Sequence, residues 1–279
     1  MTDAAGRPRP VESWHQVSFW AQDWQAAEDT AVRRIGPYLV KSEQDGRLAG
    51  WWFTRKGPCW RLRYLTCPRQ ADQVRAGIQD LMRVLAAAEA ITRWAPGVYE
   101  PETRAFGGPD GMTIAHDLFC ADSRHVLDHI RRAGSAHRCE ASVLRACTLM
   151  RAARLDWYEQ GDVWQMVAAH RVARRPSSLT EAAAIRRLLT HHAITSALDP
   201  GWPSVFSQAG QALHEAVQDG RLTRGLRAVV AHHVLFARNR AGVPASHQAI
   251  LAQAAATVAF GHDPTQPAFS ERPEPARLA

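Results

Sequence analysis

Alternating apolar and polar positions predict strands in the first quarter of the chain. Residues 14–20 (WHQVSFW) alternate with period two, which is typical of a half-buried strand. Residues 51–55 and 59–65 are also strand-like and flank the turn signal Lys56-Gly57-Pro58, so they predict a β-hairpin. The side chains of the second hairpin strand divide between two faces, with Trp60, Leu62 and Tyr64 on one and Arg61, Arg63 and Leu65 on the other.

Helical spacing follows these strands. Residues 23–35 predict a short helix that Gly36-Pro37 ends. Residues 91–99 resemble a fourth strand, and 112–132 predict a further helix after Asp110-Gly111. Between the hairpin and the fourth strand, apolar side chains recur at helical spacing at Val74, Ile78, Leu81, Met82 and Leu85.

From about Ala136 onward the pattern is helical almost throughout. Ser178 to Glu181 fits a capping box, and Gly220 separates two helices. The helix after Gly220 should carry one shared face, made of Leu222, Leu226, Val229, His233, Phe236 and Arg240. We predict an α+β fold with a small, mostly antiparallel sheet and helices in the N-terminal half and an all-helical C-terminal half.

The predicted boundaries follow this change of pattern. Residues 1–12 should form a flexible N-terminus, 13–135 the α+β part and 136–263 a helical part of the same functional unit. Residues 264–279 are rich in proline and charge, so we expect a disordered tail. No internal repeat is visible in the sequence.

Composition narrows the class of partner. Of 279 residues, 46% are hydrophobic and 22% charged, which is ordinary for a globular protein. The 34 basic and 27 acidic residues give a net charge of +7, and this favours acidic partners such as nucleic acids, acidic peptides or carboxylate substrates. Because the basic residues are scattered among acidic ones, nucleic acid is the weakest of these hypotheses.

The spacing of the cysteines and the lack of long apolar runs favour a cytoplasmic protein without a metal or redox cofactor. The five cysteines form no C-x-x-C pair, and the histidine pairs have no carboxylate or cysteine at ligand spacing. No run of about 18 apolar residues appears, so we expect no membrane span, and residues 1–10 hold no apolar signal-peptide core.

No self-sufficient catalytic motif is present, but four segments occur in a fixed order. They are 51–63 (WWFTRKGPCWRLR), 99–108 (YEPETRAFGG), 119–123 (FCADS) and 236–242 (FARNRAG). Together they resemble the thiopeptide-type bacteriocin biosynthesis proteins, which are related to the C-terminal elimination domain of class I lantibiotic dehydratases. The resemblance extends from about Trp14 to about Gly261.

This resemblance implies a ribosomally made precursor peptide as the partner, together with a companion dehydratase. In such dehydratases a separate domain esterifies Ser or Thr with glutamate, and the elimination domain removes the Cα proton and expels glutamate. Stand-alone relatives instead join two dehydroalanines in a formal [4+2] cycloaddition that builds a pyridine ring. A lyase-type elimination, this cycloaddition and non-catalytic binding of the precursor are the three hypotheses.

The sequence departs from the family pattern at three chemically important positions. Where the dehydratases carry H-x-R-x-R, Cys59 replaces the histidine and both arginines remain. Ala105 stands where an arginine precedes the aromatic residue, with Arg104 one position earlier. Leu235 replaces the histidine of H-x-x-x-N-R, while Asn239 and Arg240 remain. These departures bring an ordinary glutamate elimination into question.

Elimination needs a base near the Cα proton, donors for the enolate oxygen and a cation for the leaving carboxylate. Arg61 and Arg63 lie on one strand face, so their guanidinium groups can converge on one ligand, or instead balance nearby acids at a solvated surface. His233 shares a helix face with Arg240 and could replace the missing base, although an isolated histidine on an apolar face is more often a core residue.

We predict a single arginine-rich cleft built from these motifs. Tyr99, Glu102 and Arg104 precede the flexible Gly107-Gly108 pair, and a structural turn is the alternative role for them. The expected catalytic residues are Arg61, Arg63, Arg104, Ser123, His233 and Arg240. The expected substrate-binding residues are Tyr99, Glu102, Trp60 and Asn239, without any metal or cofactor.

Overall fold

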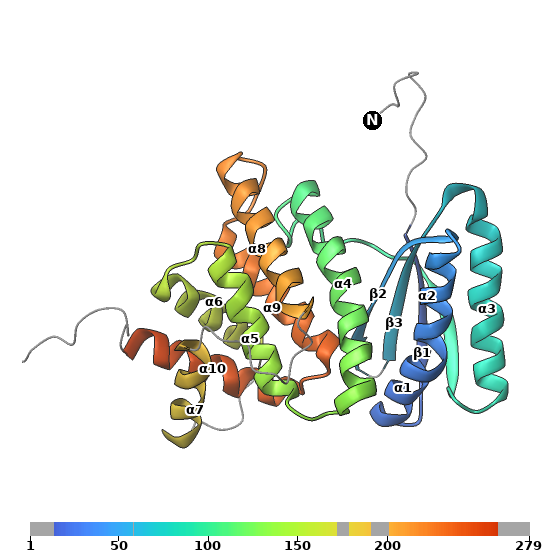
Figure 1. Cartoon of the computed structure of the whole chain (residues 1–279), viewed down its shortest axis with the longest axis horizontal. Coiled ribbons are helices and arrows are strands. Elements are labelled where there is room, and N and C mark those ends of the chain that lie inside the picture. Colours follow the sequence, from blue (N-terminus) through green and yellow to red (C-terminus); the bar gives the residue numbers. More distant parts are fainter. Residues whose placement is uncertain (1–13, 58, 172–178, 191–200, 262–279) are drawn as a thin grey trace, which may run out of the picture.

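The computed structural model describes residues 14–57, 59–171, 179–190 and 201–261 (Figure 1). The predictions for residues 1–12, Pro58, Ser178 and 264–279 lie outside these ranges. Within the described part, a four-stranded sheet lies at one end of the molecule and helices form the rest (Figure 1). The predicted α+β fold with a helical C-terminal half is confirmed.

The sheet contains β1 (Trp14–Trp20), β2 (Leu48–Lys56), β3 (Cys59–Thr66) and β4 (Arg93–Gly97). Its order is β2-β3-β1-β4, and every neighbouring pair is antiparallel. The predicted hairpin is β2 and β3, although β2 starts three residues earlier than expected. β4 is shorter than the predicted 91–99 because its pairing with β1 runs only from Arg93 to Gly97.

One face of the sheet packs against the first three helices, α1 (Trp24–Thr30), α2 (Gly36–Gln44) and α3 (Ala71–Ala87). Figure 1 shows α3 on the side of the sheet that faces away from the helical part. This face buries Val17, Phe19, Phe53, Trp60, Leu62 and Tyr64. The opposite face of β2 and β3 carries Trp52, Arg61 and Arg63, as the period-two alternation predicts.

Gly36-Pro37 does not end the first helix, contrary to the prediction. α1 passes into a π-helical turn at Ala31–Ile35, and α2 continues from Gly36. Pro37 lies in the first turn of α2, where a missing N–H costs little, and the wider π turn changes the backbone spacing just before its ring. A Cβ on Gly36 would lie 2.9 Å from Leu127 Cδ1, so glycine permits a close approach to the long helix that follows the sheet.

Seven helices form the rest of the described chain. α9 lies at their centre, since residues around its whole circumference are buried. It begins at Leu226, so Leu222, which was predicted to lie in this helix, belongs to the connection before it. The helices are α4 (Pro109–Ala133), α5 (Arg138–Ala152), α6 (Trp157–Ala169), α7 (Leu179–Thr190), α8 (Gly201–Gln218), α9 (Leu226–Ala241) and α10 (Ala245–Gly261).

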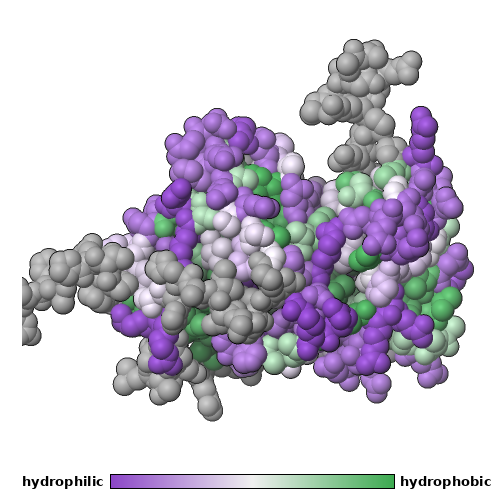
Figure 2. All heavy atoms as spheres, in the orientation of Figure 1, coloured by the Kyte–Doolittle hydropathy of each residue, from purple (hydrophilic) through white to green (hydrophobic). Residues whose placement is uncertain are grey.

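α4 and α9 connect the two halves because both contact β2. The face drawn in Figure 2 is mainly hydrophilic, and apolar residues show between the hydrophilic ones in smaller groups. Of the helices that the structure describes, none combines the length and apolar character needed to cross a membrane. All five cysteines are free thiols.

Candidate active site

A cleft of about 440 Å³ lies between the hairpin and the helical part. The hairpin contributes Thr54, Arg55, Lys56, Gly57, Arg61 and Arg63, and α9 contributes His232, Leu235, Phe236 and Asn239. The end of α6 adds His170 and Arg171, and the segment before α4 adds Glu102. We call this space the candidate cleft. Four of the predicted site residues line it, namely Arg61, Arg63, Glu102 and Asn239.

Arg63 is the most completely buried of the three arginines that reach this space from β3 and α6. Its guanidinium lies 4.3 Å from the Trp52 ring and 5.1 Å from the Tyr99 ring. Burial lowers the pKa of Arg63 to about 10, so it stays protonated at neutral pH. Its Nε and Nη1 atoms have no hydrogen-bond partner among the described residues. Donors kept dry and unpaired in this way suit an anionic ligand.

Arg61 and Arg171 bring two more cations to the candidate cleft. Arg61 lies two residues from Arg63 on the same strand face and is half-buried. Arg171 is held by neutral partners, donating from Nε to Gln248 Oε1 and from Nη2 to Asn239 Oδ1, both at 3.0 Å. Because neither partner carries charge, Arg171 keeps its positive field for the cleft.

Two histidines face the same space, and their rings lie perpendicular with centroids 5.6 Å apart. Burial, with Arg224 and His170 nearby, lowers the pKa of His232 to about 4, so its imidazole is neutral at pH 7. His170 Nδ1 lies 2.8 Å from the Met166 carbonyl, to which it can only donate. A neutral His170 therefore presents Nε2 as a proton acceptor.

The remaining predicted residues lie outside the candidate cleft. Arg104 is exposed and does not line it, and Trp60 stacks on Phe53 in the core on the other face of the sheet. Tyr99 lies behind Arg63, with its hydroxyl 2.8 Å from His116 Nε2. It can therefore position Arg63 but does not line the cleft itself.

Arg240 belongs to a buried cluster that also holds Asp122, Arg145 and Trp202, which we call the Asp122 cluster. Arg240 Nε donates to Asp122 Oδ2 at 2.6 Å, and Trp202 Nε1 donates to Oδ1 at 2.7 Å. Arg145 Nη1 reaches Oδ1 at 3.4 Å. These contacts join α4, α5, α8 and α9, so the charge of Arg240 helps to hold these helices together.

Ser123 and His233 are fully buried. The Phe53 backbone N–H donates to Ser123 Oγ at 3.2 Å, which satisfies an edge group of β2. The His233 ring packs against the Phe106 and Phe119 rings at 4.9 and 6.2 Å. Burial, with Arg240 and His232, lowers its pKa to about 3. Neither side chain reaches the candidate cleft.

Sequence reasoning missed His170, Arg171 and the cleft-facing role of His232. His170 and Arg171 follow the last turn of α6, far from every motif, and no periodic pattern marks them. Only helix packing brings the end of α6 beside α9. His232 neighbours His233, but the two side chains point into different surroundings.

Comparison with known proteins adds a family to this geometry. The profile of the family described as "Lantibiotic biosynthesis dehydratase C-term" matches residues 14–259. The chain belongs to this family. Leu235 of this family member lines the candidate cleft. The elimination domains that the sequence resembles carry a histidine at this position. Among the described residues, no three His, Cys, Asp or Glu side chains gather in a way that could hold a metal ion.

Solved structures share the fold at low sequence identity. The tRNA-dependent lantibiotic dehydratase MibB from Microbispora sp. 107891 is 17% identical with a TM-score of 0.64, over 91% of this chain and 29% of that one. TsrL is 15% identical with a TM-score of 0.61, over 90% and 95% of the two chains. The pyridine synthase TbtD from thiomuracin biosynthesis is 15% identical with a TM-score of 0.58, over 90% and 98%. No protein of curated function matches by sequence.

Proposed function

We propose that this protein modifies a ribosomally made precursor peptide, as a lyase that expels glutamate from glutamylated Ser or Thr to leave dehydroamino acids. The observation that carries the proposal is the charge of the candidate cleft. Arg61, Arg63 and Arg171 line it without a carboxylate ion pair among the described residues, and Glu102 is its one acidic lining residue. A site of this kind favours a carboxylate-bearing substrate over a neutral one.

The elimination divides naturally between the two kinds of side chain in the cleft. The imidazole of His170 or His232 takes the Cα proton of the esterified residue, and the electron pair left on Cα is delocalised onto the carbonyl oxygen as an enolate. This electron pair then forms the Cα–Cβ double bond as the Cβ–O bond breaks, and glutamate leaves with the ester oxygen as its carboxylate. The arginines stabilise the enolate oxygen and the departing carboxylate, where negative charge develops.

Family membership supports the peptide partner, because dehydratases of lantibiotic biosynthesis process peptides. MibB is a lantibiotic dehydratase by its description, and this chain spans 29% of that protein. We propose that a companion dehydratase supplies the glutamylated peptide. The [4+2] cycloaddition is the second candidate, because Leu235 occupies the place of the family's histidine within the cleft. A protein that only presents the precursor is the third.

The test is a reconstitution with the precursor peptide encoded nearest to this gene, glutamylated beforehand by the companion dehydratase. Mass spectrometry should show the glutamyl adduct converted to a dehydroamino acid. Arg63→Gln should leave most of the adduct, whereas Arg124→Gln, which removes a partner of Glu43 outside the cleft, should not. Ring closure between dehydroalanines would favour the cycloaddition, and binding without any change of mass would favour the presenting role.

The candidate bases are tested in the same reaction. His170→Gln and His232→Gln should each be compared with the wild type under single-turnover conditions. Loss of a general base costs roughly a hundred- to ten-thousandfold in rate. If neither substitution slows elimination, the base lies elsewhere, while the role of the arginines is still decided by Arg63→Gln.

A further inference from the structure

A second pocket of about 550 Å³ adjoins the candidate cleft. The two spaces share Arg55, Gly57 and Asn239 as lining residues, so they lie side by side. Its other walls come from α1, from the start of α5 and from the junction of α9 with α10. We call it the Glu28 pocket, after the buried carboxylate in its wall.

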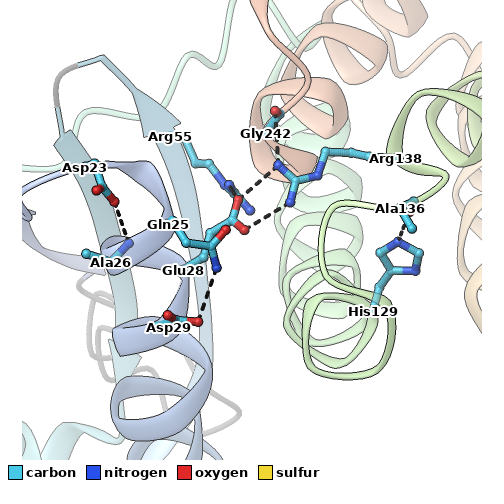
Figure 3. A network of polar contacts seen from close by, with 10 residues as sticks. All are labelled: Asp23, Gln25, Ala26, Glu28, Asp29, Arg55, His129, Ala136, Arg138 and Gly242. Atoms are coloured by element: carbon cyan, nitrogen blue, oxygen red, sulfur yellow. Dashed lines mark hydrogen bonds and ion pairs between the residues drawn. The ribbon is translucent and has the colours of Figure 1, made fainter.

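Two arginines share that one carboxylate, as Figure 3 shows. Arg55 Nη1 pairs with Glu28 Oε1, and the two terminal nitrogens of Arg138 lie 3.0 Å from the two Glu28 oxygens. The Arg55 side chain is only 5% exposed, yet its Nε and Nη2 have no hydrogen-bond partner among the described residues. The wall therefore carries one excess positive charge and two buried donors without an acceptor.

Gly242 makes this arrangement possible. Its φ of +72° lies in the left-handed region, and a Cβ there would meet Arg55 Nη1 at 2.4 Å and Arg138 Nη1 at 2.9 Å. The Gly242 carbonyl accepts from Arg138 at 3.4 Å. Both guanidinium groups are thus held against the backbone beside the pocket, and their positions are set before any ligand arrives.

The N-terminus of α10 adds donors at the same wall. Ala245 is its first residue and lines the pocket with Pro244. The helical hydrogen bonds start with Gln248 N–H to Pro244 C=O, so the backbone N–H groups of residues 245–247 have no acceptor within the helix. No acidic side chain occupies this first turn. The end of the helix and Arg55 therefore both favour an anion.

Apolar side chains also line the pocket, beside the polar Asn239 and Gln248. Trp24 is 46% exposed, which is unusual for a tryptophan, and it lines the pocket together with Val243 and Pro244. An apolar surface beside the excess positive charge fits an organic body that carries a carboxylate better than a small inorganic anion.

We propose that the Glu28 pocket binds an acidic residue of the peptide whose neighbouring residue is processed in the candidate cleft. This rests on the proposed function, because it assigns the pocket to the same peptide. The carboxylate accepts from Arg55 and from the first turn of α10, while Trp24 covers the adjoining carbon atoms. The pocket thereby selects peptides that carry Asp or Glu near the modified Ser or Thr.

Binding of a small probe tests the pocket without any turnover. The probe is the blocked tripeptide N-acetyl-glycyl-glutamyl-glycinamide, with its glutaminyl counterpart as the control. The protein is labelled with 5-fluorotryptophan, and the ¹⁹F signal of Trp24 is identified by its loss in Trp24→Phe. The glutamyl probe should shift this signal and bind at least tenfold more tightly than the glutaminyl one. Equal binding of both probes would overturn the proposal.

A pair of substitutions at Ala245 makes the test independent of the buried arginines. Ala245→Asp places a carboxylate at the first turn of α10, where it suits the helix dipole and competes with the probe. Ala245→Asn has the same size without the charge. Affinity for the glutamyl probe should fall at least tenfold in Ala245→Asp and stay within twofold in Ala245→Asn; equal losses in both would reject the carboxylate site.

A titration with inorganic phosphate tests whether the pocket binds an inorganic anion instead of a carboxylate. If phosphate shifts the Trp24 signal and the glutamyl probe does not, the pocket binds phosphate, and the carboxylate assignment is wrong. If the probe binds as expected but the protein eliminates no glutamate, the pocket is retained and only the proposed function fails. Binding and turnover are measured separately, so the two failures are distinguishable.

Discussion

In the Asp122 cluster two guanidinium groups share one buried carboxylate, whereas in the candidate cleft three arginines have no ion-paired carboxylate among the described residues. Both regions contain arginines from the sequence segments that carry the family resemblance. Arg240 and Asp122 are wholly buried and join helices of the core. Arg63 is nearly as buried, but its partners are the rings of Trp52 and Tyr99.

The comparison shows that the partner of the guanidinium, rather than its burial, separates the two roles. A buried arginine bonded to a carboxylate from another helix is fixed within the fold, and removing the partner is costly. A buried arginine held by aromatic rings keeps donors that a ligand can satisfy. The two arginines should therefore respond differently to substitution, one in stability and the other in turnover.

The largest effect is expected from Asp122→Ala. This change leaves Arg145 and Arg240 buried without their carboxylate and should lower the free energy of unfolding by about 3–5 kcal/mol. Urea denaturation followed by circular dichroism measures it. Asp128→Ala on the same helix is the matched control, because Asp128 pairs with partly exposed Arg131 and Arg132 and should cost less than about 1 kcal/mol. Similar losses in both variants would remove the distinction.

Arg63→Gln should show the opposite pattern. Its free energy of unfolding should stay within about 1 kcal/mol of the wild type, because no carboxylate loses its partner. Turnover of the glutamylated peptide should fall roughly 30- to 160-fold, from the loss of about 2–3 kcal/mol of charge-assisted hydrogen bonding. Denaturation and single-turnover kinetics on one preparation give both numbers. A variant that unfolds easily but turns over normally would reverse our assignment.

His233→Phe tests a buried group that has no ionic partner. The folded pKa of about 3 lies below the ordinary 6.5, so the imidazole stays neutral in the folded protein and takes a proton on unfolding below about pH 6.5. Its contribution to stability is complete above pH 6.5 and is lost as the pH falls toward 3, by up to about 1.4 kcal/mol per pH unit. Urea denaturation across this range should show a shallower pH dependence in His233→Phe, and equal slopes would contradict the prediction.

The smallest effect is expected at the surface pair Arg83–Asp80, whose side chains are 62% and 58% exposed. Arg83→Ala should change the free energy of unfolding by less than about 0.5 kcal/mol, because solvent screens the pair. It should leave turnover unchanged as well. A larger loss would mean that exposed pairs contribute to the fold as the Asp122 cluster does, which would weaken the contrast between buried and exposed charge.

The sequence alone was sufficient for the fold class, because local periodicity reports which face of an element is buried. The alternation in 14–20 and 59–65 placed both strands, and Trp60 and Arg61 lie on opposite faces as that pattern requires. The prediction was wrong at Gly36-Pro37, since proline is tolerated in the first turn of a helix and a π turn just before it lets the chain continue. The helix-breaking tendency of Gly-Pro does not reveal that a π turn can precede it.

In the candidate site too, the sequence determined some features and the tertiary structure decided others. Arg61 and Arg63 share a strand face because β-strands have a period of two, so their proximity was determined by the sequence. Whether Arg240 meets a ligand or a carboxylate depends on Asp122, 118 residues earlier, and no local pattern contains that distance. His170 and Arg171 reach the cleft only because α6 packs beside α9. Local sequence sets which way a side chain faces, and the tertiary structure decides what it meets there.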